Sequence, residues 1–336
     1  MSRALDSETA GSLRAGNPWA AYQAISHVLT SPCDGLLEIE ILGKSHFGEG
    51  QYVLQDGNAV GIAKPGLVQA FIVARRRLRD HIDGVEPLTD DDIFAVTAVI
   101  LLLDPEHLTA ANSRKRLIQG HVADGDVRTR LEKEKRFVDT LLTSRLHRHT
   151  KSPNLWSHRR WLLGTLWSLG LPVGVLGDIK NVVFVAGERH PRNYYAWCHA
   201  RFLTRLNRCA NDREMLAAVQ SWCFQHHVDI SGWSFLYFLL AVDDGLGTEA
   251  GSSTFNEVIK LVNSLRLTNE SVWVFLRTLA GSGLIGDEQL SQLLAVQQTI
   301  LDTSPKPTDQ AVLRSAIDWC KAYGCKKQEG HASVET

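Results

Sequence analysis

A compact string of rings and permanent charges constrains this chain more than any other feature. Residues 152–164 read SPNLWSHRRWLLG, and residues 193–204 read NYYAWCHARFLT. Both contain the pattern W-x-H-x-R-[WF]-L, and their first tryptophans, Trp156 and Trp197, lie 41 residues apart. A pattern this long at a fixed spacing indicates an internal repeat rather than an isolated motif.

Weaker copies extend the repeat in both directions. SGWSFLYFLL aligns Trp233, NESVWVFLRTLA aligns Trp273 with Arg277, and LTAANSRKRLI has Ala111 where the ring would stand. A supersecondary unit of about 40 residues without strand-like alternation is typical of stacked helix pairs. The sequence therefore predicts an all-α fold, an α–α superhelix or solenoid of antiparallel helix pairs.

The spacing within the motif gives it a structural role. Residues three and four apart share a helix face, so Trp156, Arg160 and Leu163 form one stripe. One ring can then pack within its own helix pair while the other meets the next pair, and the arginine stem lies along the ring so that its head can reach a carboxylate or a carbonyl of the neighbouring repeat. The structural repeat motif is predicted to comprise Trp156, His158, Arg160, Trp161, Asn193, Trp197, His199, Arg201, Trp233 and Trp273.

The sequence pattern changes near residue 65, from short mixed runs to a helical spacing of apolar residues. We expect residues 1–64 to be an irregular N-terminal segment with room for a small hairpin, residues 65–325 to be the helical-repeat superhelix, and residues 326–336 to be a disordered tail. Pro65 suits a first helical turn, and Thr89 suits an N-cap. The expected later helices are 126–147, 153–169, 176–189, 193–208, 211–226, 230–242, 253–266, 269–280, 286–301 and 308–323.

Bulk composition excludes several classes of protein. The 336 residues carry 36 basic and 37 acidic side chains, so no global field attracts nucleic acid. No run is long and apolar enough for a transmembrane segment, and the N-terminus does not read as a signal peptide. Six cysteines without a C-x-x-C pair favour free thiols in a cytoplasmic protein.

The W-x-H-x-R-W motif at this period resembles the repeat of protein prenyltransferase α subunits. Within that family, the stretches 91–118 and 226–240, and DGLLEIEILG near the N-terminus, are most similar to the repeat-containing branch. The resemblance implies a crescent of helix pairs that forms a heterodimer with a separate β subunit, which holds the Zn²⁺ and the isoprenoid pocket. It implies the α-type subunit of a third type of protein geranylgeranyltransferase, whose β subunit is shared with the Rab enzyme and whose substrates include SNAREs.

The same resemblance carries over three residues of HPRNYYAW, because catalytic α subunits have K-N-Y-x-A-W in the matching place. Arg192 takes the position of a lysine that reaches the isoprenoid diphosphate, Asn193 that of the asparagine, and Tyr194 that of the tyrosine. Arg192 and Tyr194 are thus the candidate catalytic residues, and Arg192 the candidate diphosphate-binding residue. Arginine in place of lysine is a departure from the family pattern. An exposed turn charge for Arg192, a packed turn residue for Tyr194 and a helix cap for Asn193 are the structural alternatives.

Two other groups of residues give weaker signals of a functional site. His147 and His149 lack cysteine or carboxylate partners at ligand spacing, so no metal site and no cofactor are expected in this chain. The basic run ARRRLRD, residues 74–80, is typical of a solvated face or a subunit contact.

Two functions follow. The first is the non-zinc α subunit of a prenyltransferase that transfers a geranylgeranyl or farnesyl group to a C-terminal cysteine of protein substrates and is inactive alone. The alternative is a non-catalytic helical-repeat scaffold or adaptor.

Overall fold

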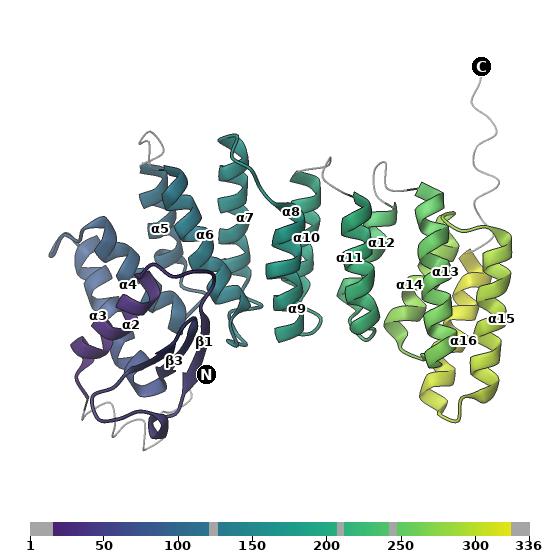
Figure 1. Ribbon diagram of the computed structural model, residues 1–336, viewed down its shortest axis with the longest axis horizontal. Coiled ribbons are helices and arrows are strands. Elements are labelled where there is room, and N and C mark those ends of the chain that lie inside the picture. Colours follow the sequence, from purple (N-terminus) through teal and green to yellow (C-terminus); the bar gives the residue numbers. More distant parts are fainter. Residues whose placement is uncertain (1–15, 121–126, 207–211, 242–246, 324–336) are drawn as a thin grey trace. The chain divides into compact units, whose positions relative to one another are not determined.

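The computed structural model describes residues 16–120, 127–206, 212–241 and 247–323 (Figure 1). Contacts divide the chain into two compact units, Met1–Gly174 with Asn181–Phe202, and Val175–Lys180 with Leu203–Thr336. Helices dominate both units, so the all-α class expected from the repeat is confirmed. The tail expected at 326–336 lies outside the described residues.

The helices follow the predicted ranges closely. Those of the first unit are α2 (Pro18–Thr30), α3 (Lys64–Ile82), α4 (Asp90–Leu103), α5 (Leu108–Gly120), α6 (Val127–Thr143), α7 (Pro153–Ser168), α9 (Val185–Arg189) and most of α10 (Tyr194–Leu206). Those of the second are α8 (Val175–Asp178), α11 (Asp212–Gln225), α12 (Ile230–Ala241), α13 (Gly247–Leu265), α14 (Glu270–Ser282), α15 (Asp287–Thr303) and α16 (Pro307–Tyr323). A π-helical turn, η2 (Ile179–Phe184), joins α8 to α9 in the range expected as one helix.

Neighbouring helices pack in the order that a hairpin repeat requires. In the first unit α4 packs on α5 and α6 on α7, and in the second α12, α14 and α16 lie side by side (Figure 1). We call α5, α7, α10, α12 and α14 the motif helices, because they carry the five copies of the repeat. No helix of the described ranges combines the length and the apolar character that crossing a bilayer requires.

Helix starts show why these residues fold as they do. Thr89 caps α4 in a capping box, in which the Thr89 hydroxyl accepts from the Asp92 amide while the Asp92 carboxylate accepts from the Thr89 amide. In three motif helices the cap lies four residues before the tryptophan, at Ser152, Asn193 and Asp229. The cap position is therefore part of the repeat.

The N-terminal segment is more ordered than expected. Helix α2 begins at Pro18, with Asn17 as its N-cap. An asparagine cap followed by proline is a local signal of a helix start, so the expectation of an irregular segment was wrong here. A β2 (Val53–Asp56) and β3 (Ala59–Ala63) hairpin is present, and β1 (Glu38–Leu42) pairs with β3 in parallel to give the order β1-β3-β2. A short 3₁₀ turn, η1 (Lys44–His46), follows β1.

Two side-chain hydroxyls, from Thr140 of α6 and from Ser144 directly after α6, accept hydrogen bonds along the outer edge of β1. The Leu37 amide donates to Thr140 Oγ1 over 3.2 Å, and the Ile39 amide donates to Ser144 Oγ over 3.1 Å. Ser144 in turn donates to carbonyls of Leu37 and Thr140. Edge strands with open N–H groups invite pairing with other chains, and here Thr140 of α6 and the adjoining Ser144 supply the missing partners.

Replacing Ser144 with alanine tests this seal. The Ser144→Ala variant leaves the buried Ile39 amide without an acceptor, so we expect a loss of about 1–3 kcal/mol in the free energy of unfolding and faster amide exchange at Ile39. Urea denaturation and hydrogen exchange measure the two effects. Ser168→Ala, at the exposed end of α7, is the control; an equal loss in both variants contradicts the sealing role.

Candidate functional site

The indole N–H of the motif tryptophan is bonded in the same way in three repeats. Trp156 Nε1 donates to the Thr150 carbonyl over 2.9 Å, Trp233 to His227 over 3.1 Å, and Trp273 to Leu267 over 2.9 Å. Each acceptor lies six residues earlier, in the turn that precedes the motif helix. All three rings are buried, as is Trp197. The indole therefore joins the motif helices α7, α12 and α14 to their own preceding turns.

The same ring faces the next repeat. Trp156 lies 5.2 Å from the His199 ring, and Trp233 lies 5.1 Å from the Phe275 ring. His199 and Phe275 both stand two residues after the tryptophan of the following copy. The surroundings of the two tryptophans are thus equivalent, with an imidazole in one repeat and a phenyl ring in the other.

Cations stacked on rings explain the composition of the motif. Lys115 Nζ lies 5.8 Å from the Trp161 ring, the Arg160 guanidinium 4.9 Å from Phe202, and the Arg277 guanidinium 5.6 Å from Trp319. Each cation sits on one helix and its ring on the next helix of the same layer. A partly desolvated cation over a ring face is attracted by the ring quadrupole. Arg201, the matching cation of α10, also donates to the Trp197 carbonyl of its own helix.

The buried arginine of α7 is Arg159, which the motif pattern did not predict. Arg159 is fully buried; its Nε donates to Asp139 Oδ1 over 2.7 Å, and its Nη1 lies 2.7 Å from His199 Nε2. Arg114 occupies the same place in the degenerate copy and forms a two-point pair with Glu134 over 2.6 and 2.8 Å. The signal was present, because each lies three residues after the ring position, on the same helix face.

Both motif histidines belong to this buried network. His199 accepts from Arg159, since a guanidinium only donates, and burial followed by the nearby arginines lowers the pKa of His199 well below its usual value. His158 Nε2 lies 3.1 Å from Glu134 Oε1, and burial lowers the pKa of His158. Burial alone raises the pKa of Glu134, but Arg114 and His158 outweigh it and lower that pKa to about 2. The structure thus places these histidines as neutral packing partners.

Asn193 connects the turns of two successive repeats through hydrogen bonds. Its Oδ1 caps α10 by accepting from the Ala196 amide, and its Nδ2 donates to the Thr150 carbonyl over 2.6 Å. The Thr150 carbonyl also receives the Trp156 indole. One carbonyl oxygen thus fixes both the turn before α7 and the turn before α10.

The two candidate catalytic residues lie on the surface of this fixed turn. Arg192 is exposed and has φ 61°, a left-handed conformation that is uncommon for a residue with a side chain. Tyr194 is 67% exposed and makes an edge contact, 5.6 Å between centroids, with Tyr195. Arg192, Asn193 and Tyr194 are adjacent, but only Asn193 is buried. The structure therefore brings Arg192 and Tyr194 together at a surface rather than in an enclosed site.

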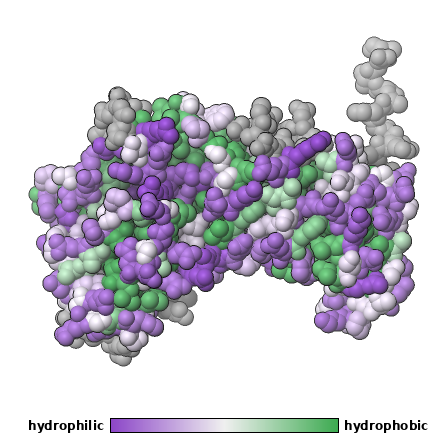
Figure 2. All heavy atoms as spheres, in the orientation of Figure 1, coloured by the Kyte–Doolittle hydropathy of each residue, from purple (hydrophilic) through white to green (hydrophobic). Residues whose placement is uncertain are grey.

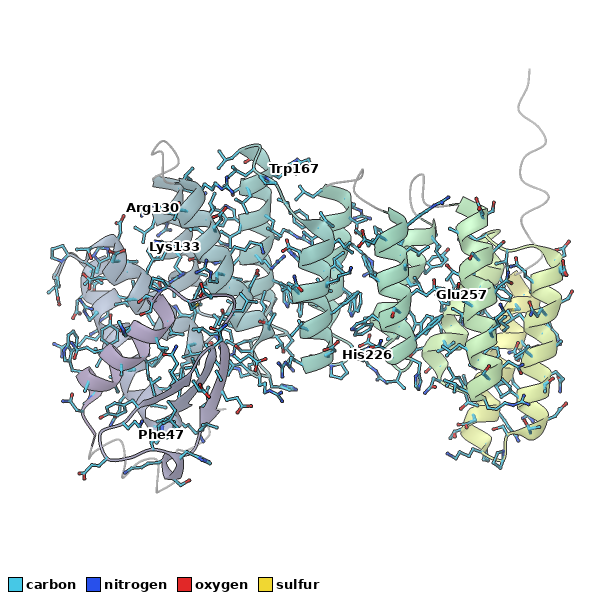
Figure 3. The ribbon with its side chains drawn as sticks, in the orientation of Figure 1. Phe47, Arg130, Lys133, Trp167, His226 and Glu257 are labelled. Atoms are coloured by element: carbon cyan, nitrogen blue, oxygen red, sulfur yellow. The ribbon has the colours of Figure 1, made fainter. Side chains whose placement is uncertain are left out.

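A basic face covers the motif helices of the first unit. Helices α5 and α7, with residues 194–202 of α10, contain no aspartate or glutamate but six lysines and arginines. Arg114 and Arg159 are buried and neutralised by α6. We define the basic face by the remaining cations and the rings beneath them: Lys115, Arg116, Arg160, Trp161, Arg201 and Phe202. The side chains of these helices are drawn in Figure 3.

The other constellations from the sequence do not form catalytic clusters. His149 is buried against the Leu101 carbonyl, whereas His147 contacts His190. Across the described ranges no group of three or more histidine, cysteine, aspartate or glutamate side chains could hold a metal ion. In the basic run of α3, Arg76 and Arg79 form exposed pairs with Asp80.

The repeated indole bond, the cation–ring contacts and the helix hairpins define a helical-repeat protein of the class expected from the motif. A family model described as the ECM9 middle domain matches residues 155–265, which contain three of the five motif copies. The chain is 32% identical over 166 residues to Protein ECM9 of Saccharomyces cerevisiae, covering 48% of this chain and 43% of that protein.

Vertebrate relatives carry the name of the repeat itself. The human protein prenyltransferase alpha subunit repeat-containing protein 1 is 32% identical over 175 residues, covering 46% of this chain and 40% of that protein. The Xenopus laevis protein 1-B is 28% identical over 173 residues, covering 46% and 38%. The resemblance expected from the motif is thus confirmed for about half of this chain, which spans about two fifths of the length of these relatives.

Truncation of Trp156 tests the repeat interface. Trp156→Ala removes a buried ring, its bond to Thr150 and its contact with His199, so we expect a loss of about 3–5 kcal/mol in the free energy of unfolding. Trp167→Ala on the same helix is the control, because Trp167 is 45% exposed. Chemical denaturation measures both variants; an unchanged free energy of unfolding in Trp156→Ala argues against a role of this ring in the repeat interface.

Acid should destabilise the fold through its buried histidines. Burial lowers the pKa of His149 from 6.5 to about 4, so the unfolded chain binds more protons than the folded chain between these values. The stability that neutral His149 contributes is complete above pH 6.5 and falls by about 1.4 kcal/mol per pH unit as the pH drops towards 4. His158 and His199 act in the same direction.

Urea denaturation at several pH values measures this slope. His149→Gln keeps a donor for the Leu101 carbonyl but cannot take up a proton, so its stability should depend less on pH in this range. His27→Gln, at an exposed position of α2, should keep the full slope. A His149→Gln slope that matches wild type contradicts the assignment.

Proposed function

We propose that this chain is the α-type subunit of a heterodimeric protein prenyltransferase, acting in the cytoplasm on C-terminal cysteines. The basic face of the first unit carries the proposal. A separate β subunit would bind the geranylgeranyl or farnesyl diphosphate and the Zn²⁺, and this chain would contribute no cofactor. The names of the relatives support the α-type assignment.

The basic face suits a polypeptide partner. Four cations, Lys115, Arg116, Arg160 and Arg201, project from helices that offer no carboxylate of their own. Trp161 and Phe202 lie beneath two of these cations and hold them in fixed positions. Fixed cations beside rings favour an acidic, well-packed partner surface, because complementary charge steers association and rings contribute buried area.

The turn at Arg192 could support the chemistry at the edge of such an interface. Diphosphate leaves with growing negative charge, so a cation and a hydroxyl donor near its oxygens lower the barrier. Arg192 offers a forked donor set and Tyr194 a hydroxyl, and the Asn193 bonds fix the turn that carries both. Zinc in the partner would lower the pKa of the acceptor thiol and supply a thiolate.

One set of observations favours the alternative, a non-catalytic scaffold or adaptor. Phe235 and Phe275 stand where His158 and His199 stand in the strong copies, Ala111 replaces the ring, and Arg192 departs from lysine. Packing tolerates these changes, since Phe275 still meets Trp233. A scaffold needs the basic face but has no need for Arg192 or Tyr194.

Reconstitution separates the two functions. The chain is co-purified with candidate prenyltransferase β subunits and assayed with farnesyl and geranylgeranyl diphosphate; transfer is expected only with a partner. Arg192→Ala should lower the rate by ~10²-fold, the effect of losing one donor to a developing oxyanion, and Arg192→Lys should restore much of it. Arg128→Ala, an exposed residue of α6, is the control. Transfer by the chain alone, or a wild-type rate in Arg192→Ala, contradicts the subunit role.

A further inference from the structure

We propose that a surface cavity beside the Asn193 turn binds a phosphate-class oxyanion. The cavity has a volume of about 620 Å³, within the range of small-molecule sites. Its lining comes from the turn after α6 and from the end of α9, namely Arg145, Leu146, His147, Thr150, Glu188 and Arg189. All of these residues belong to the first unit.

The two turns that line the cavity are rich in cations and are held in fixed register. Arg145 and Arg189 contribute guanidinium groups, and His147 Nε2 lies 3.1 Å from His190 Nδ1 across the two turns. The bond from Asn193 to the Thr150 carbonyl ties the same turns together. Donors fixed before a ligand arrives reduce the ordering cost of binding, and forked guanidiniums match phosphate oxygens.

Two carboxylates of strand β1 already form ion pairs with these guanidinium groups, which shows that the guanidiniums are placed to bind anionic oxygens. Arg189 Nη2 lies 3.0 Å from Glu38 Oε1, and Arg145 Nε lies 3.6 Å from Glu40 Oε1. The carboxylate side chains are 62% and 52% exposed. Exposed pairs of this kind contribute little, so a ligand of higher charge density can displace them. Glu38 and Glu40 are therefore competitors for the site.

The histidine pair makes binding dependent on pH. Burial, His147 and Lys151 lower the pKa of His190, so a second proton on the pair is unfavourable without an added anion. The other charged groups around the pair are Arg145, Arg148, Glu188 and Arg189, with Asp104 paired to Arg148. A bound phosphate offsets the extra positive charge, so affinity should rise as the pH falls from 8 to 6.

This inference does not depend on the proposed function, because the test uses the full chain without a partner. The chain is titrated with inorganic pyrophosphate at constant ionic strength, followed by calorimetry and by the NMR signals of its histidines. Parallel titrations use inorganic phosphate and geranyl diphosphate, which share the phosphate chemistry but differ in source. Saturable binding of pyrophosphate with a stoichiometry of one, tighter at pH 6 than at pH 8, is the expected result.

Two variants with opposite expected effects make the test specific. Arg189→Gln should weaken pyrophosphate binding by about 10-fold or more, because one charge-assisted donor set is lost. The double variant Glu38→Gln/Glu40→Gln should strengthen binding, because it removes the competing carboxylates. Arg128→Gln on α6 is the matched control and should bind as wild type.

The outcomes separate the site from general charge attraction. Binding that is equal in Arg189→Gln, that weakens in the glutamine double variant, or that chloride abolishes at the same ionic strength overturns the proposal. If Arg189→Gln fails to fold, the double variant alone decides. Geranyl diphosphate binding more tightly than pyrophosphate assigns the site to a lipid diphosphate, and equal binding assigns it to the phosphate group itself.

Discussion

The bond from the motif indole to the carbonyl six residues earlier is the constraint on which the rest of the structure depends. It occurs at Trp156, Trp233 and Trp273, and in each case it fixes the turn that begins the motif helix. A fixed turn sets the position of the cap, and the cap sets the rotation of the helix about its axis. With the rotation of α7 fixed in this way, its cation Arg160 lies over the Phe202 ring of α10.

Helix α6 supplies the charges that this arrangement needs inside the first unit. Glu134 pairs with Arg114 and His158. Asp139 pairs with Arg159 and Lys135. Buried ion pairs often add little net stability, because desolvation offsets their attraction. Their value here is specificity: a two-point pair admits one register of α6 against α5 and α7. Thr140 of the same helix and Ser144, the residue directly after it, close the edge of β1, so this segment joins the repeat to the N-terminal sheet.

The repeat, the all-α class and the ranges of the later helices could be predicted from sequence, because the period and the caps are local signals. The parallel pairing of β1 with β3 could not, since it joins residues separated by a turn, a 3₁₀ segment and another strand. The motif pattern points to Arg160, whereas its neighbour Arg159 is the arginine that is fully buried. The motif leaves open whether Arg192 is an exposed turn charge and whether Tyr194 is a packed turn residue. Both side chains are exposed, which excludes the packed alternative for Tyr194.

The absence of aspartate and glutamate from α5, α7 and residues 194–202 has a consequence for the local field of the first unit. Although the whole molecule is nearly neutral, an anion near this surface responds to the local field of four cations, two of which are held over rings. The attraction between this surface and an anion should therefore weaken as the ionic strength rises, although the net charge of the whole chain is close to zero.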